Sequence, residues 1–207
     1  GVITAETGMS LVGVRGRAMA TAAANAEPTG MSAIIGGDEG EIVGRLAALG
    51  LTPANMNGAG QIVAAGAMDA LAALSAEPPA GTRVIPLQVA GAFHTSFMEP
   101  AVAALREAAS AVSPTDPIGT LWTNHDGSIV TSGATALDLL VGQVASPVRW
   151  DRCMASFADA GVTGIIELTP AGTLVGLAKR ALKGVPTVAI KTPEDLASAV
   201  TLIEEAA

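Results

Sequence analysis

Six short segments between Pro28 and Ala90 have patterns that predict a strand, a helix, two strands, a second helix and a last strand. In chain order these segments are 31–35, 38–49, 53–56, 61–65, 67–75 and 83–89. Asp38 stands at the start of the first helix, where its carboxylate can cap free backbone N–H groups. This order of elements is the split unit of ferredoxin-like folds. It predicts that residues 28–90 form a small ferredoxin-like subdomain.

Helical and apolar strand patterns alternate along the rest of the chain. Helices are predicted at 7–24, 99–112, 135–144, 150–160, 173–182 and from Thr192 onward, and strands at 119–123, 162–168 and 187–190. Helices that alternate with buried strands are typical of a mostly parallel sheet covered on both faces. The expected fold class is α/β, in which residues 1–27 and 91–207 form a larger subdomain and residues 28–90 are inserted into it.

The charge balance argues against several classes of partner. The chain has 11 Lys and Arg against 19 Asp and Glu, with a net charge of -8. Nucleic acids need a basic stripe, and anionic membranes also attract basic proteins. No apolar run reaches the ~18–20 residues of a membrane span, and no signal-peptide pattern is present. Cys153 is the one cysteine, which indicates a cytoplasmic protein without disulfides, and the two histidines lack a zinc-binding spacing, so no metal or cofactor is expected.

His94 is the strongest candidate for a general base. It follows a strand pattern that breaks at Gly91 and precedes the helix predicted at 99–112. Enzymes of the α/β class commonly hold catalytic groups on such turns. The alternative is a histidine that packs or forms hydrogen bonds at the end of a strand, and on position alone that alternative is the more common.

Arg15 also has two readings. Its neighbours on the predicted helix are Leu11, Val12 and Met19, so it either extends to solvent from the helix edge or is held partly buried to meet an anion. Arg17 points elsewhere and is expected to be solvated.

No nucleophile accompanies these two residues. The chain has no Gly-x-Ser-x-Gly sequence, and Thr95 and Ser96 follow His94 too closely. Cys153 lies in an apolar helical pattern and is expected to be a buried, unreactive thiol. The glycine-rich stretches match neither phosphate-binding pattern, GxGxxG or Walker.

Five ordered motifs resemble those of malonyl-CoA:acyl carrier protein transacylases, the enzymes of bacterial type II fatty-acid synthesis. The motifs are Val14-Arg15-Gly16 with Met19, then Asn55 to Val63, Gly91-Ala92-Phe93-His94, Gln143-Val144 with 147–150, and 170–174. The resemblance covers essentially the whole chain. It implies a large α/β-hydrolase-like subdomain with an inserted ferredoxin-like subdomain.

The resemblance also implies an activity. A serine attacks malonyl-CoA to form a seryl ester, and the malonyl group then passes to the phosphopantetheine thiol of acyl carrier protein by a ping-pong route. His94 would be the base, the backbone carbonyl of Gln143 would orient it, and Arg15 would bind the malonyl carboxylate. Met19 and Phe93 would line the acyl pocket. Contacts to the pantetheine arm would come from Asn57, Gln61 and Arg83, and Asn124 would lie near the active site. His125 is expected at the surface.

The chain departs from the family in lacking the nucleophile elbow, which is expected upstream of Gly1. We therefore expect the C-terminal two-thirds of an enzyme that is monomeric when full length, inactive as given, and left with a bare apolar face. The alternatives are a polyketide-synthase-type acyltransferase, a non-catalytic fragment that binds CoA or carrier protein, and a small-molecule-binding module. Candidate basic residues for an acidic carrier protein are Arg83, Arg149, Arg152, Lys179, Arg180 and Lys183.

Overall fold

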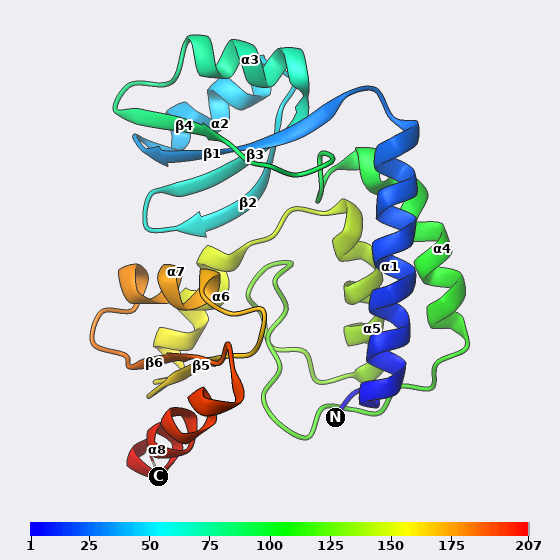
Figure 1. The fold of residues 1–207 in the computed structure, drawn as a ribbon, viewed down its shortest axis with the longest axis vertical. Coiled ribbons are helices and arrows are strands. Elements are labelled where there is room, and N and C mark those ends of the chain that lie inside the picture. The colour runs from blue at the N-terminus through cyan, green and yellow to red at the C-terminus, as the bar shows by residue number, and fades with distance from the viewer. Residues whose placement is uncertain (207) are drawn as a thin grey trace.

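The structure is a computed structural model that describes residues 1–206. A four-stranded sheet forms its upper part (Figure 1), in the order β2-β3-β1-β4 with every neighbouring pair antiparallel. The strands are β1 (Thr29–Gly36), β2 (Thr52–Gly58), β3 (Gln61–Ala67) and β4 (Thr82–Pro86), and the helices between them are α2 (Glu39–Ala48) and α3 (Met68–Ala76). The predicted order of elements in 28–90 is confirmed. Asp38 caps α2 as expected, because its carboxylate accepts from the backbone N–H of Glu41 at 3.0 Å.

The two faces of this sheet have different neighbours because side chains alternate along a strand. Ile34 pairs with Ile62 and Val84 and packs with buried Leu46 of α2 and Leu74 of α3. The next residues along the strands face the other way. There Met31, Val63 and Ala65 pack with Ala92, and half-buried Phe93 lies against them.

Three helices pack side by side to form a second part of the molecule (Figure 1). They are α1 (Ala5–Asn25), α4 (Glu99–Ser110) and α5 (Gly133–Gly142), and the short 3-10 helix η1 (Ser96–Met98) leads into α4. Their shared core contains the buried side chains of Leu11, Met19, Met98, Leu105 and Val141. The predicted helices at 7–24, 99–112 and 135–144 are therefore confirmed, with ends shifted by a few residues.

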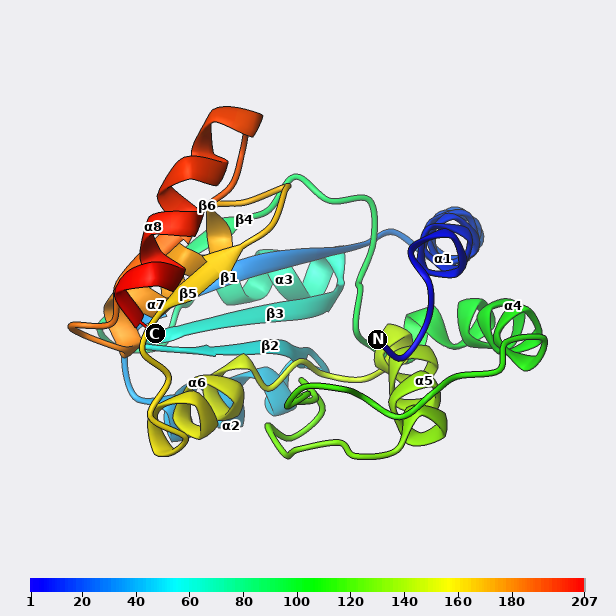
Figure 2. The ribbon, with the colours of Figure 1, turned by 90° about the horizontal axis from the view of Figure 1, so that it is seen from below.

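The C-terminal part contains the 3-10 helix η2 (Gln143–Ala145), α6 (Trp150–Asp159), β5 (Ile165–Glu167), α7 (Thr173–Ala181), β6 (Thr187–Ala189), the 3-10 helix η3 (Pro193–Asp195) and α8 (Leu196–Ala206). Strands β5 and β6 form a parallel pair. Figure 2 shows α7 and α8 on the opposite side of the molecule from α1 and α4. Among the described residues, no helix is both long and apolar enough to cross a membrane.

The mostly parallel sheet predicted for the chain outside 28–90 is limited, among the described residues, to this pair of strands, and the four-stranded antiparallel sheet belongs to 28–90. The strand predicted at 119–123 is wrong, because the chain reverses after it. The backbone N–H of Thr123 donates to the carbonyl of Ser128, and the N–H of Val130 donates to the carbonyl of Leu121. These bonds form one isolated bridge between Trp122 and Ile129. Strand β4 ends at Pro86, before the predicted end at residue 89, because the N–H of Val89 donates to the carbonyl of Leu87 within its own segment.

A short backbone pairing connects the sheet to the C-terminal part. The N–H of Met56 donates to the carbonyl of Val148 at 2.9 Å, and the N–H of Val148 donates to Ala54 at 2.8 Å. The segment that leads from Gln143 to α6 is thus held along the edge strand β2. This pairing helps to set the place of Gln143.

Candidate functional site

His94 lies on a tight turn between β4 and η1, with φ at 60°, in the left-handed region that non-glycine residues rarely occupy. Two threonines hold this turn. The hydroxyl of Thr95, which is buried, donates to the carbonyl of Ala92 at 2.6 Å and accepts from the N–H of Phe97. The N–H of Ala92 donates to the hydroxyl of Thr29 at 3.1 Å. The turn is therefore fixed on both sides of His94, which orients its ring.

The ring of His94 contacts the backbone of Gln143. Its Nδ1 lies 3.0 Å from the Gln143 carbonyl oxygen. A carbonyl only accepts hydrogen bonds, so Nδ1 carries the hydrogen and Nε2 is left as the acceptor. Burial lowers the pKa of His94 below 6.5, and the charge of Arg15 lowers it further, although backbone groups of Gln143 and Ser146 oppose the shift. A neutral ring with a free Nε2 at neutral pH is the form that a general base requires.

Arg15 is half-buried on α1 and is directed toward the same residue. Its Nη2 donates to the side-chain oxygen of Gln143 at 3.4 Å. Its Nε is buried and has no hydrogen-bond partner among the described residues. Burial lowers the pKa of Arg15, yet a guanidinium stays charged at neutral pH. Of the two readings of Arg15, the structure supports the one in which the side chain is held inward, while Arg17 is exposed as predicted.

The two residues expected in the acyl pocket are neighbours of Arg15 and His94 along the chain. Met19 follows Arg15 by one helical turn and is buried in the core of the three helices. Phe93 directly precedes His94, is half-buried, and lies against both the helical core and the sheet face that carries Met31.

The three residues expected at the pantetheine arm share one end of the sheet. Ile35 pairs with Gln61 on one side and with Arg83 on the other, so these side chains share a face. It is the face that carries Val63, and hence the one that meets Phe93. The side-chain amide of Asn57 donates to Gln61 at 3.3 Å, whereas Arg83 is exposed. The structure brings these three residues, on the strands β2, β3 and β4, to the same end of the sheet.

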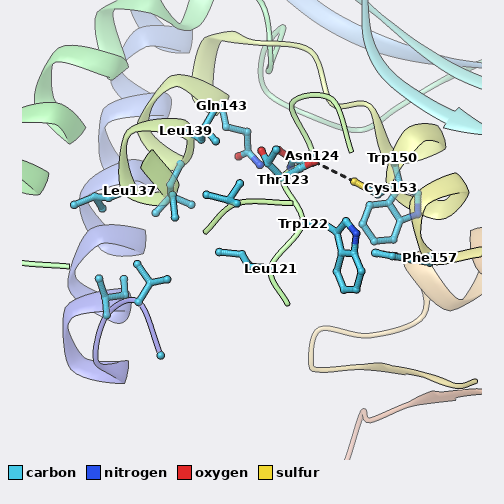
Figure 3. A pocket seen from close by; sticks show the side chains of 16 residues that line it. Leu121, Trp122, Thr123, Asn124, Leu137, Leu139, Gln143, Trp150, Cys153 and Phe157 are labelled. Atoms are coloured by element: carbon cyan, nitrogen blue, oxygen red, sulfur yellow. Dashed lines mark hydrogen bonds between the residues drawn. The ribbon is translucent and has the colours of Figure 1, made fainter. Parts of the chain in front are cut away.

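A cavity of about 510 Å³ lies between α5 and α6 (Figure 3), and Gln143 and Asn124 line it together. The backbone carbonyl of Asn124 accepts a hydrogen bond from the N–H of Arg149 at 2.8 Å. Most of the remaining lining is apolar and includes Leu121, Trp122, Leu137, Leu140, Trp150 and Phe157. The indole N–H of Trp150 is buried without a hydrogen-bond partner among the described residues. The cavity is therefore mostly apolar, with the polar groups of Gln143 and Asn124 on its wall.

Cys153 and His125 lie where the sequence predicts. The Cys153 thiol is buried, donates to the carbonyl of Thr123 at 3.4 Å, and burial raises its pKa to about 11. His125 is exposed. Within residues 1–206, no cluster of three or more His, Cys, Asp or Glu is arranged to hold a metal ion.

Two features of the site and its surroundings were missed by sequence reasoning. The backbone of Ser146 lies beside His94, and the Ser146 hydroxyl donates to the carbonyl of Gly142 at 2.9 Å. Glu167 is a buried carboxylate that accepts from the N–H groups of Gly172, Leu174 and Val175 at 2.9 to 3.0 Å. A lone acid at the end of an apolar strand, followed by a glycine turn into a helix, is the signal that could have indicated Glu167.

The chain is similar to known proteins along almost its whole length. No protein-family model matches it. The malonyl CoA-acyl carrier protein transacylase of Mycobacterium tuberculosis is 54% identical over 196 residues, which cover 95% of this chain and 65% of that protein. The protein of the same name from Mycolicibacterium smegmatis is 54% identical over 200 residues, covering 95% of this chain and 69% of that one.

The crystal structure of MCAT from Mycobacterium tuberculosis matches the fold with a TM-score of 0.92, at 54% identity, over 96% of this chain and 65% of that one. The α/β fold seen here is therefore the fold of that protein over the shared region. The chain spans about two thirds of the length of its curated relatives. On this identity and coverage, the chain belongs to the malonyl-CoA:acyl carrier protein transacylase family.

Proposed function

We propose that this protein takes part in transferring a malonyl group from malonyl-CoA to the phosphopantetheine thiol of acyl carrier protein, in cytoplasmic fatty-acid biosynthesis. One observation carries the proposal: Arg15 and His94 both contact Gln143. A cation suited to a carboxylate and a neutral imidazole suited to proton transfer therefore lie on two sides of one residue. Malonyl thioesters need both groups, because they carry a carboxylate at one end and react at the other.

The chemistry runs through a seryl ester. Nε2 of His94 accepts the proton of the serine hydroxyl as the oxygen attacks the thioester carbon, and then gives that proton to the sulfur of CoA, which leaves as the thiol. In the second half, Nε2 accepts the proton of the carrier thiol, whose sulfur attacks the seryl ester, and returns that proton to the departing serine oxygen, so the serine hydroxyl is regenerated. The Gln143 carbonyl holds the imidazole in the required tautomer and takes the place of the acid of a triad.

The serine is the group that this chain does not supply. Its 207 residues contain no Gly-x-Ser-x-Gly sequence, and they span 65% of the M. tuberculosis relative. We propose that the nucleophile belongs to the third of the family's length that these residues do not span, and that these residues alone do not acylate themselves.

The remaining site residues have binding roles in this proposal. Arg15 pairs with the malonyl carboxylate, and Met19 and Phe93 shape the acyl pocket. Asn57, Gln61 and Arg83 contact the pantetheine arm along the sheet face, and Asn124 lies near the reacting centre. Residues 28–90 form a ferredoxin-like subdomain inserted into a partial α/β-hydrolase-like subdomain made of 1–27 and 91–207.

A second candidate is a non-catalytic fragment that binds CoA or carrier protein. The lack of a Gly-x-Ser-x-Gly sequence within these 207 residues favours it. A polyketide-synthase-type acyltransferase would use the same chemistry, and transfer assays with carrier proteins of the two pathways would separate it from the fatty-acid enzyme.

Intact-protein mass spectrometry after incubation with malonyl-CoA tests the proposal. The chain alone should gain no malonyl adduct, whereas a complex with the part of the M. tuberculosis relative that it does not span should become acylated on that part. His94→Ala in the complex should slow acylation about a hundredfold or more. An adduct on the isolated chain, or an undiminished rate with His94→Ala, would contradict the proposal.

A further inference from the structure

Gln143 makes two separate contacts with the candidate site. Its backbone carbonyl meets Nδ1 of His94, a contact that any residue at this position would keep. Its side-chain oxygen accepts from Nη2 of Arg15, a contact that needs an acceptor on the side chain. The backbone contact orients the base His94, and the side-chain contact holds the cation Arg15. A substitution at position 143 by a residue without such an acceptor therefore removes the contact to Arg15 and keeps the contact to His94.

Arg15 needs such a partner to stay where it is. Its guanidinium is partly buried, its Nε has no partner among the described residues, and burial disfavours the charge. A long arginine side chain on a helix edge can extend to water instead, which removes that cost. The hydrogen bond to Gln143, at 3.4 Å, is the described side-chain contact that opposes this movement.

An amide is a fitting partner for this purpose. It accepts a hydrogen bond and carries no charge, so it orients the guanidinium without neutralising it. A glutamate in the same place would form an ion pair with Arg15 and would compete with a carboxylate of the ligand. Arginine has five N–H donors, and one of them is engaged by Gln143, which leaves others for a second acceptor.

We propose that the side chain of Gln143 is the positioning residue for Arg15 and thereby sets the preference for acyl groups that end in a carboxylate over neutral acyl groups. This inference rests on the proposed function. Gln143 acts through Arg15 and not on the thioester itself. Its loss should therefore weaken the binding of malonyl-CoA while leaving the binding of acetyl-CoA unchanged.

The test compares the 207-residue chain with its Gln143→Met and Gln143→Glu variants. Calorimetry with malonyl-CoA and with acetyl-CoA measures the preference for the carboxylate. In Gln143→Met the affinity for malonyl-CoA should fall about tenfold, the size of one hydrogen bond to a charged group. Gln143→Glu should lose at least as much, and acetyl-CoA should bind all three proteins equally. Gln88→Met is the matched control, because Gln88 is exposed and its side chain makes no hydrogen bond to Arg15 or His94 among the described residues.

A second measurement follows His94 by NMR. The charge of Arg15 lowers the pKa of His94, so release of Arg15 in Gln143→Met should raise that pKa, while the backbone contact stays. A residue that served packing alone would not shift this titration. Both histidines of the chain can be assigned with a His125→Gln variant.

The outcomes separate this inference from the proposed function. If the unchanged chain binds malonyl-CoA no better than acetyl-CoA, the proposed carboxylate site is wrong. If the unchanged chain has the preference and Gln143→Met keeps it, or loses affinity for both thioesters by the same factor, only the role of Gln143 is wrong. Should Gln143→Met fail to fold, the nearly isosteric Gln143→Glu decides, and an unaltered preference in it overturns the inference.

Discussion

Nη2 of Arg15 lies 3.4 Å from Oε1 of Gln143, although 128 residues separate them in the sequence. Arg15 lies in the middle of α1, and Gln143 begins η2 directly after α5. They meet because these helices pack in one bundle, whose core holds Leu11, Met19 and Val141. The same bundle continues into α4, which begins just after His94. A cation and a base from distant segments are thus placed around a single residue.

The protonation of His94 should depend on its burial. Burial and the charge of Arg15 lower its pKa, so NMR titration should give a value below 6.5. Arg15→Met should raise that pKa without restoring 6.5, because burial is the larger cause. As pH falls, His94 takes up its proton in the unfolded chain before it does so in the folded chain. The contribution of His94 to stability is therefore complete above pH 6.5 and is lost as pH falls through the folded-state pKa. A measured value at or above 6.5 would contradict the neutral-base arrangement.

Thr95 should be important for stability because its hydroxyl is buried with both of its hydrogen bonds made within the turn. Thr95→Val keeps the shape and leaves the Ala92 carbonyl and the Phe97 N–H without this partner. Urea unfolding should show a loss of about 1–3 kcal/mol. Thr201→Val is the control, because Thr201 is exposed on α8, and it should change stability by less than about 0.5 kcal/mol. Equal effects of the two substitutions would show that the turn is not held as described.

Glu167 should hold the start of α7 through its charge. Burial raises its pKa, but hydrogen bonds from Val175, Leu174 and Gly172 and the charge of Lys191 more than offset this, so the pKa lies below 4.5. Glu167→Gln should cost about 2 kcal/mol in urea unfolding at neutral pH. The stabilisation by Glu167 is complete above pH 4.5 and is lost as pH falls through the lowered pKa. The Glu167→Gln variant should lack this pH dependence. The exposed Glu107→Gln serves as control, and a comparable loss there would argue against the role of Glu167.

Cys153 should react slowly while the protein is folded. Burial raises its pKa from 9.0 to about 11, which leaves about a hundredfold less thiolate, the reactive form. A thiol-disulfide exchange reagent at pH 8 should therefore react at least about a hundredfold more slowly in buffer than in concentrated urea. Rapid labelling of the folded chain would show an accessible thiolate and would reopen Cys153 as a nucleophile.

Local signals in the sequence were enough to predict most of the elements. The α2 helix is the clearest case. The Asp38 cap and the spacing of the apolar residues after it involve only residues within one or two turns of each other. The opening of the last helix is another, because the Asp195 carboxylate accepts from the N–H of Thr192 at 2.9 Å. The strand at 119–123 failed because a strand needs a partner, and this segment pairs with its own turn.

The residue types alone determined that this chain can hold an α/β fold, a base on a turn at His94 and a cation at Arg15, because helical spacing, turn residues and ionisable groups are properties of short segments. Two questions were decided by the tertiary structure. One was whether Arg15 extends to water or is held inward, and the other was whether the ring of His94 reaches the Gln143 carbonyl that the family resemblance implies as its acceptor. Both answers depend on Gln143, which reaches these residues only when the helices pack and β2 pairs with Val148. Contacts between segments so far apart are set by the packing of whole elements, which no local pattern records.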